Sequence, residues 1–170
     1  VYNAYFLGMN GNCSFSGDKR TDSKINYVNS DDASKNILNP DAYGRVKYNN
    51  VYDHIDIQYY KTDENQLKYD LIVQPGGEVG QVKIKYDGVK RIKTNERGEL
   101  EILTPWGTTL EEKPYSYQII NGVVKEVKVK FTIIDETTYG FKIIGRYDRS
   151  HELIIDPTIV EWSTYACTTA

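Results

Sequence analysis

Two histidines and a few clustered carboxylates are the residues of this chain that could do acid–base or metal chemistry. His54 lies between Asp53 and Asp56, and imidazole and carboxylate groups at that spacing could bind a metal ion or exchange protons. The plainer interpretation is a polar turn with a solvated histidine. His151 belongs to neither a His-x-His pair nor an HExxH motif, and there is no cysteine–histidine cluster. The sequence therefore predicts no catalytic, cofactor-binding or metal-binding residue.

Acidic pairs occur at Asp31-Asp32, Asp63-Glu64 and Glu111-Glu112. None has the alternating oxygen ligands and central glycine of a calcium loop, so solvated positions or helix caps explain them more simply. Motifs of a serine nucleophile elbow, a phosphate-binding loop or a dinucleotide site are absent from the sequence. Paired carboxylates for glycoside cleavage meet in space rather than in sequence. We expect a protein that is not an enzyme.

Composition restricts the function classes further. Lysine plus arginine number 21 and aspartate plus glutamate 24, which gives a formal charge of −3. This balance supplies no basic field for nucleic acid or an anionic membrane. No stretch approaches the roughly 18 apolar residues of a membrane-spanning helix. The chain has 15 tyrosines against four phenylalanines and two tryptophans, and tyrosine suits a half-buried pleated surface.

The two cysteines, Cys13 and Cys167, lie far apart and have no metal-type spacing. They are either independent thiols or a long-range disulfide, which requires an oxidising compartment. The sequence leaves both interpretations open.

Alternation of apolar and polar residues with a period of two is the dominant pattern. It places one face of a strand on a core and the other in water, as in antiparallel sheets. The pattern appears at residues 67–71, 82–86, 99–103 and 127–133. Asn121-Gly122 predicts a tight hairpin between a strand at 115–120 and a long strand at 123–134. Other expected turns lie at 75–77, 87–88, 95–98 and 135–138.

Only residues 30–36 suggest a helix, with Ser30 or Asp31 as the cap of a single turn before Asn39-Pro40. We expect about ten strands in an all-β, mainly antiparallel, sandwich-like domain with at most one or two short helical turns. A single domain over 1–165 with a tail at 166–170 is the simplest organisation. The alternative is two packed β lobes divided near 74–80.

The order of short motifs along the chain is more specific than any one motif. The motifs are Arg45-Val46-Lys47-Tyr48, Ile55-Asp56-Ile57-Gln58-Tyr59-Tyr60, Gln66-Leu67-Lys68-Tyr69-Asp70-Leu71-Ile72-Val73, Lys113-Pro114-Tyr115, Leu153-Ile154-Ile155-Asp156-Pro157 and Ser163-Thr164-Tyr165. The ordered set resembles the N-terminal β domain of secreted Bacteroidota proteins that carry SBBP-type β-propeller repeats. Those proteins often end in a type IX secretion or gliding-motility module.

The resemblance spans residues 10–165 and implies an extracellular or bacterial cell-surface location without any catalytic residue. The family usually has further β structure upstream of Val1 and a glycine-rich propeller repeat after Tyr165, so we expect this chain to be a piece of a longer protein.

The expected function is that of a non-catalytic structural and protein–protein interaction module within a larger extracellular assembly, with a neighbouring domain or subunit as its partner. One alternative is a carbohydrate-binding module that uses exposed tyrosines to hold a glycan. A second is an accessory domain of an extracellular hydrolase. Contacts with the partner are expected from the two end segments, at Tyr2, Tyr5, Ile159, Trp162 and Tyr165.

Overall fold

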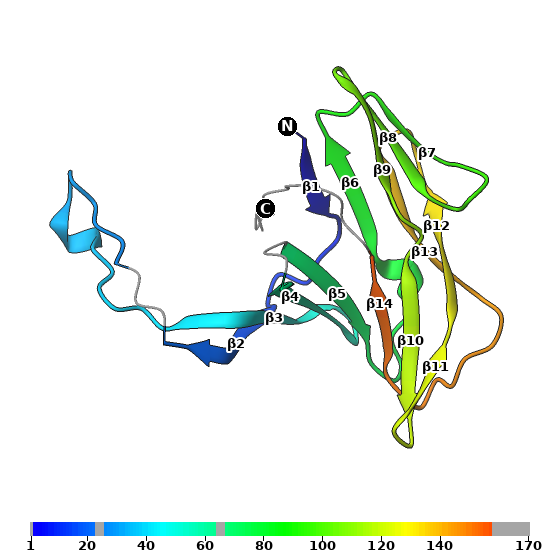
Figure 1. Ribbon diagram of the computed structural model, residues 1–170, viewed down its shortest axis with the longest axis horizontal. Coiled ribbons are helices and arrows are strands. Elements are labelled where there is room, and N and C mark those ends of the chain that lie inside the picture. Colours follow the sequence, from blue (N-terminus) through cyan, green and yellow to red (C-terminus); the bar gives the residue numbers. More distant parts are fainter. Residues whose placement is uncertain (1, 23–25, 64–66, 158–170) are drawn as a thin grey trace.

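The computed structural model describes residues 2–22, 26–63 and 67–157 (Figure 1). In these ranges the chain forms fourteen strands and two short 3-10 helices. They are β1 (Asn3–Phe6), β2 (Ser14–Thr21), η1 (Ala33–Lys35), β3 (Ala42–Tyr52), β4 (Ile55–Lys61), β5 (Leu67–Val73), η2 (Val79–Gln81), β6 (Lys83–Asp87), β7 (Arg91–Thr94), β8 (Leu100–Thr104), β9 (Gly107–Glu111), β10 (Tyr115–Ile120), β11 (Val123–Glu126), β12 (Lys128–Ile133), β13 (Thr138–Ile144) and β14 (Leu153–Asp156).

The strands form three antiparallel sheets. A seven-stranded sheet has the order β11-β10-β14-β5-β4-β3-β2, a four-stranded sheet β1-β6-β13-β12, and a three-stranded sheet β7-β8-β9. The predicted all-β, antiparallel fold class is confirmed, with more strands than the ten expected. No helix in the described ranges is long and apolar enough to span a membrane.

Strand β14 is an interior strand of the seven-stranded sheet. It lies between β10 and β5, where Ile155 is the register partner of both Ser116 and Leu71. A strand from the end of the described chain therefore joins two parts of the sheet that come from distant stretches of the sequence. Both of its backbone edges are hydrogen-bonded, unlike those of an edge strand.

The core lies between the sheets and consists of the apolar members of each alternating strand. Ile55, Leu71 and Ile155 of the seven-stranded sheet are buried, as are Ile84 and Phe141 of the four-stranded sheet. Aromatic rings join the two sheets: the rings of Phe6 and Tyr69 meet edge to face with centroids 5.9 Å apart. The tyrosine hydroxyls of this core need polar partners, and Tyr52 finds one in the backbone oxygen of Leu7, 3.0 Å away.

The hairpin predicted at Asn121-Gly122 is confirmed, because both residues have positive φ (52° and 77°) and join β10 to β11. The single long strand predicted over 123–134 is wrong. It divides at Val127, whose side chain is buried and whose N–H donates to the Ser116 oxygen. Residues before this point pair with β10 and residues after it pair with β13 in the other sheet. Burial of Val127 at the change of sheet explains the division.

The other turns give mixed outcomes. Residues 95–98 form the expected loop between β7 and β8, and Gly88 has φ of 88° as a tight turn requires. That turn connects two different sheets, however, rather than a hairpin. The helical turn is found at η1, but its cap is Asp32, which accepts a hydrogen bond from the Ser34 N–H; Ser30 and Asp31 do not cap it.

Candidate functional site

A long hairpin projects from the body of the molecule and carries an exposed apolar surface. We call residues 14–22 and 26–47 the arm; it contains β2, η1 and most of β3 (Figure 1). Every residue of β2 is exposed. The large apolar side chains that the arm exposes are Phe15, Tyr27, Val28, Ile37, Leu38 and Tyr43, with Phe15 at 75% and Val28 at 71% of their full accessibility.

The tip of the arm is held together by its own hydrogen bonds. Tyr27 and Ile37 exchange two backbone bonds of 2.9 Å, and the Asn36 side chain accepts from the Asn29 N–H at 2.8 Å. Closer to the body, Arg20 forms an ion pair with Asp41. The arm therefore presents its apolar side chains on a defined backbone, although the body of the domain does not cover them.

The face of the seven-stranded sheet that points away from the core carries a cluster of polar and aromatic side chains. We call Arg45, Tyr60, Lys68, Asp70, Tyr117 and Asp156 the outer-face cluster. Alternation places them together: Arg45 is opposite Tyr60, Tyr60 is opposite Lys68, and Tyr117 is opposite Ile154, two residues before Asp156. In the register of β14 and β5, the pair after Ile155 and Leu71 is Asp156 and Asp70. Two carboxylates thus face each other on neighbouring strands.

Each carboxylate of this pair has its own partner. The Tyr60 hydroxyl donates to Asp70 Oδ1 at 3.1 Å, and Lys68 Nζ lies 3.6 Å from Asp156 Oδ1. Burial raises the pKa of Asp70 to about 6, and the charge of Asp156 adds to the rise. Burial also raises the pKa of the Tyr117 hydroxyl, with Asp70 and Asp156 contributing. Asp70 therefore keeps its proton to a higher pH than an exposed aspartate does.

The cluster extends across strands that lie well apart in the sheet. Arg45 on β3 and Tyr117 on β10 are four strand positions apart, which is about 19 Å in a flat sheet. The positive charge of Arg45 nevertheless acts on the Tyr117 hydroxyl and opposes the rise in its pKa. The long side chains of Arg45 and Tyr117 thus lie within range of each other's charge. Figure 1 shows the change in strand direction from β10 and β14 to β3 and β4.

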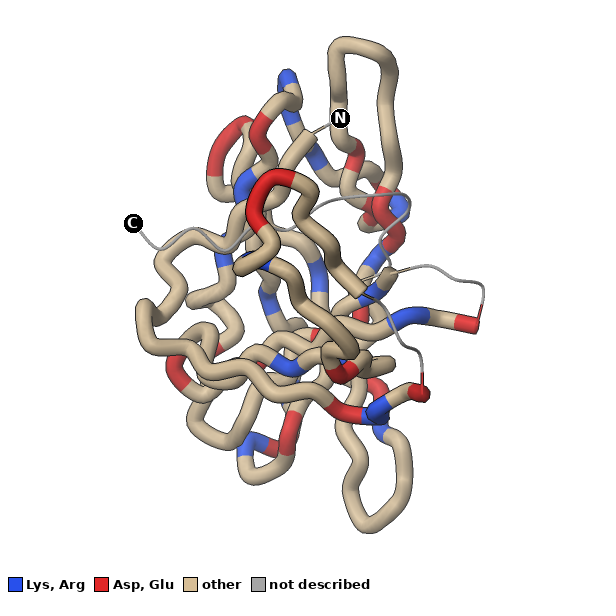
Figure 2. The backbone as a smooth tube through the Cα atoms, turned by 90° about the vertical axis from the view of Figure 1, so that its left-hand side faces the viewer, with Lys and Arg blue, Asp and Glu red and all other residues tan. Residues whose placement is uncertain are grey.

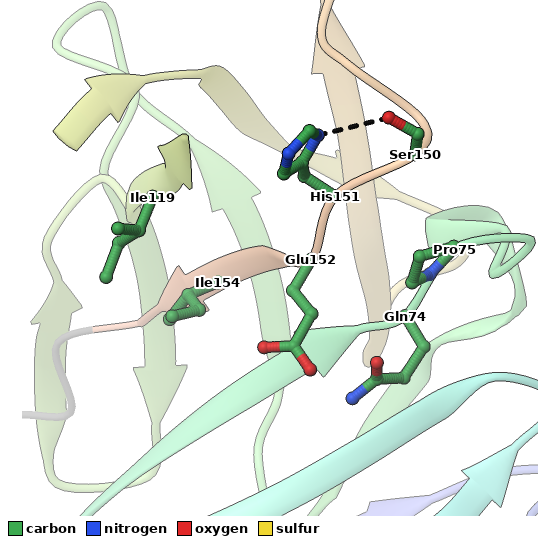
Figure 3. Close-up of a pocket in the computed structure, with 7 residues that line it drawn as sticks. All are labelled: Gln74, Pro75, Ile119, Ser150, His151, Glu152 and Ile154. Atoms are coloured by element: carbon green, nitrogen blue, oxygen red, sulfur yellow. Dashed lines mark hydrogen bonds between the residues drawn. The ribbon is translucent and has the colours of Figure 1, made fainter. Parts of the chain in front are cut away.

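A pocket of about 390 Å³ opens on the same face, beyond the cluster. Ile119 and Ile154 line one side of it, with Gln74 and Pro75 opposite (Figure 3). Ser150, His151 and Glu152 supply the remaining polar groups. Its size falls in the range of about 300–1,000 Å³ that small-molecule sites occupy.

The serine and histidine of this pocket do not form a nucleophilic pair. Ser150 Oγ lies 3.1 Å from Nδ1 of His151, and it donates to Asp148 Oδ1 at 2.6 Å. Asp148 Oδ2 also contacts Nδ1 of His151, at 3.1 Å. A catalytic serine needs the other ring nitrogen, with the carboxylate alone on Nδ1. Here Asp148 organises the turn, since it also accepts from the Ser150 N–H.

The residues around His54 are not brought together as a metal or acid–base group. Asp56 is 8% exposed and is engaged by Lys47 Nζ at 2.8 Å, the Asn50 N–H at 2.8 Å and the Gln74 amide at 3.2 Å. His54 is exposed at the turn, with φ of 60°. His54 therefore lies in a polar, exposed turn, which was the plainer interpretation of the sequence. In the part of the chain that the structure describes, no group of three or more histidine, cysteine, aspartate or glutamate side chains could hold a metal ion.

The expected partner-binding residues lie partly outside the described ranges. Tyr2 and Tyr5 are half-buried on and beside β1, and the Tyr2 ring packs edge to face on Tyr86 with centroids 5.1 Å apart. Ile159, Trp162 and Tyr165 lie outside the described residues, as does Cys167, so the pairing of Cys13 stays open.

Sequence reasoning missed one buried acid. The pair Glu111-Glu112 was expected to be solvated, which is wrong for Glu111, because it is 2% exposed. It accepts a hydrogen bond from the Tyr86 hydroxyl, and Glu112 is exposed. In an alternating strand, Glu111 falls on the same face as Thr109. That position alone does not distinguish a buried carboxyl group from an exposed one.

Together these features define an antiparallel all-β domain with a projecting arm and a polar outer face. The chain belongs to the family described as Domain of unknown function (DUF7948), whose model matches residues 1–158. No curated protein and no solved structure gives a significant match to the chain.

Proposed function

We propose that this domain is a non-catalytic interaction module of a secreted or cell-surface bacterial protein, and that it contacts a neighbouring subunit or domain through the arm. The observation that carries the proposal is the exposure of six large apolar side chains on the arm, of which Phe15 and Val28 are the most exposed. Apolar surface gathered on one projecting element is characteristic of protein interaction sites. The extracellular location is supported by the ordered motifs of the sequence.

Within the described residues, strand β2 offers an unpaired backbone edge to which the partner could bind. It is the last strand of the seven-stranded sheet and pairs with β3 along one side, from Ser14 opposite Asn49 to Thr21 opposite Ala42. An extended segment of the partner could continue the sheet along the other side, with main-chain hydrogen bonds supplying affinity. Side chains such as Phe15 would then supply specificity.

Site-specific photo-crosslinking in the native bacterium tests the proposal. A photoreactive phenylalanine analogue at Val28 is expected to give one discrete cross-linked species, which Phe15→Ser reduces. The matched control is the same analogue at Trp106, which is 78% exposed on the turn between β8 and β9. Equal cross-linking from both positions, or none from Val28, would contradict an arm-mediated contact. Protection of the chain from protease added to intact cells would contradict the surface location.

A further inference from the structure

The outer face combines both signs of charge with aromatic rings. At its centre Arg45, Lys47 and Lys68 are close to Asp56, Asp70 and Asp156. The three cations balance the three carboxylates. Figure 2 shows that basic and acidic residues are interleaved along the chain as a whole. A surface that recognises a polyanion or a polycation would carry an excess of one sign.

The polar groups are held in position before any ligand arrives. Tyr60 is fixed by its bond to Asp70, and the Arg45 guanidinium lies 5.8 Å from the centre of the Tyr60 ring. Lys68 and Asp156 have side chains that are only 21% and 24% exposed. Asp156 Oδ1 is buried, and its partner Lys68 Nζ, at 3.6 Å, lies beyond hydrogen-bond distance. A carboxylate oxygen in this state can accept a hydroxyl donor.

Ring surfaces lie beside these groups. Tyr115 and Tyr117 project from the same face of β10, with ring centroids 5.5 Å apart and planes inclined by only 30°. Tyr115 is 48% exposed. The pocket next to Tyr117 adds the apolar surfaces of Ile119 and Ile154, which continue the same face of the same two strands.

A ligand that fits this face needs apolar ring faces and many neutral hydroxyl groups. Sugar rings have both: their C–H faces pack on aromatic rings, and their hydroxyls bond to planar carboxylate, guanidinium and amide groups. We propose that the outer face, from Arg45 and Tyr60 through Asp70, Asp156 and Tyr117 to the pocket, is a binding site for a neutral saccharide chain. This proposal is independent of the arm.

Affinity electrophoresis of the full chain tests it, with native gels that contain hydroxyethylcellulose, xylan, galactomannan or pullulan as probes. Slower migration is expected in at least one of these neutral polysaccharides. Tyr117→Ala and Asp70→Asn are each expected to reduce the affinity at least tenfold. Trp106→Ala removes an exposed ring from the turn between β8 and β9 and is expected to have no effect.

Thermal melting of each variant shows whether it is folded. If Tyr117→Ala does not fold, Asp70→Asn and Tyr60→Phe, which removes only a hydroxyl, decide the result. Unchanged migration of the wild-type chain in all four gels overturns the proposal. Retardation that Asp70→Asn leaves intact also overturns it, as does retardation by anionic alginate alone.

Discussion

The Tyr86 hydroxyl donates a hydrogen bond to Glu111 Oε1 inside the core, and the Tyr139 hydroxyl lies 3.0 Å from that of Tyr86. Glu111 comes from β9 of the three-stranded sheet, whereas the two tyrosines come from neighbouring strands of the four-stranded sheet. This contact therefore joins two sheets through a carboxyl group. Burial raises the pKa of Glu111 to about 7, although the bonds from Tyr86 and Tyr139 partly oppose the rise.

Stability is expected to fall as the pH rises, because folding favours the protonated form of Glu111. Its contribution is complete below the ordinary pKa of 4.5 and is lost as the pH passes through about 7. The loss is on the order of 3 kcal/mol. Urea unfolding between pH 4 and pH 8 measures it, and Glu111→Gln should make the fall shallower, leaving the part that comes from Asp70, whose pKa is also raised. The matched control Glu112→Gln changes an exposed neighbour, and an identical effect of both variants would refute the assignment.

Asp56→Asn should destabilise the domain by about 2 kcal/mol, because it leaves the partly buried Lys47 without its counter-charge. Desolvation acts to raise the pKa of Asp56, but the bonds from Lys47, Asn50 and Gln74 outweigh it, and the pKa is lowered. The ionised form is therefore the stabilising one, and its contribution is lost as the pH falls below the usual 3.8. Chemical denaturation at pH 7 provides the measurement. Asp87→Asn, at an exposed position, should have little effect.

Gly122→Val should reduce the free energy of unfolding by about 1 kcal/mol or more, since φ at this residue is 77° and no atom lies within 4 Å of an added Cβ. The cost is therefore one of backbone conformation rather than of collision. Gly11 has the same open surroundings without the positive φ, so Gly11→Val is the control. Equal melting temperatures for the two variants would exclude a type I′ turn.

Gly140→Ala should destabilise the domain because the added Cβ would collide with a neighbouring backbone atom. A Cβ at this buried position of β13 would lie 2.7 Å from the Val82 backbone oxygen, so strand and neighbour must move apart. We expect a loss of about 1–3 kcal/mol in thermal or denaturant unfolding. Gly80→Ala meets no atom within 4 Å and should be nearly neutral. A stable Gly140→Ala variant would show that β13 and η2 are less tightly packed than described.

Local patterns predicted those parts of the fold that depend on neighbours in sequence. The alternation at 67–71 correctly indicated β5, and Asn121-Gly122 correctly indicated a hairpin. The division at Val127 was not predicted. Alternation begins at Val127 and residues 123–126 depart from it, but this departure does not indicate that the following strand joins another sheet.

The candidate site was less accessible to sequence reasoning. Alternation could place Asp70 and Asp156 on polar faces of their own strands, but it could not show that β14 and β5 are neighbours. The two residues are 86 positions apart, and their proximity depends on the strand order of the sheet. The burial of Glu111 could not be predicted from local sequence either, because the residues that surround it are tyrosines on β6 and β13.

The position of β14 determines how the domain responds to force. Tension transmitted through Pro157 enters β14, where the ladders to β10 and β5 resist together. Tension transmitted through Tyr2 enters β1, which is paired only with β6 in the described sheet. Under load β1 has to break only its ladder to β6, whereas β14 must break two ladders at once. The domain is therefore mechanically asymmetric, with a weak attachment at its first strand and a strong one at its last.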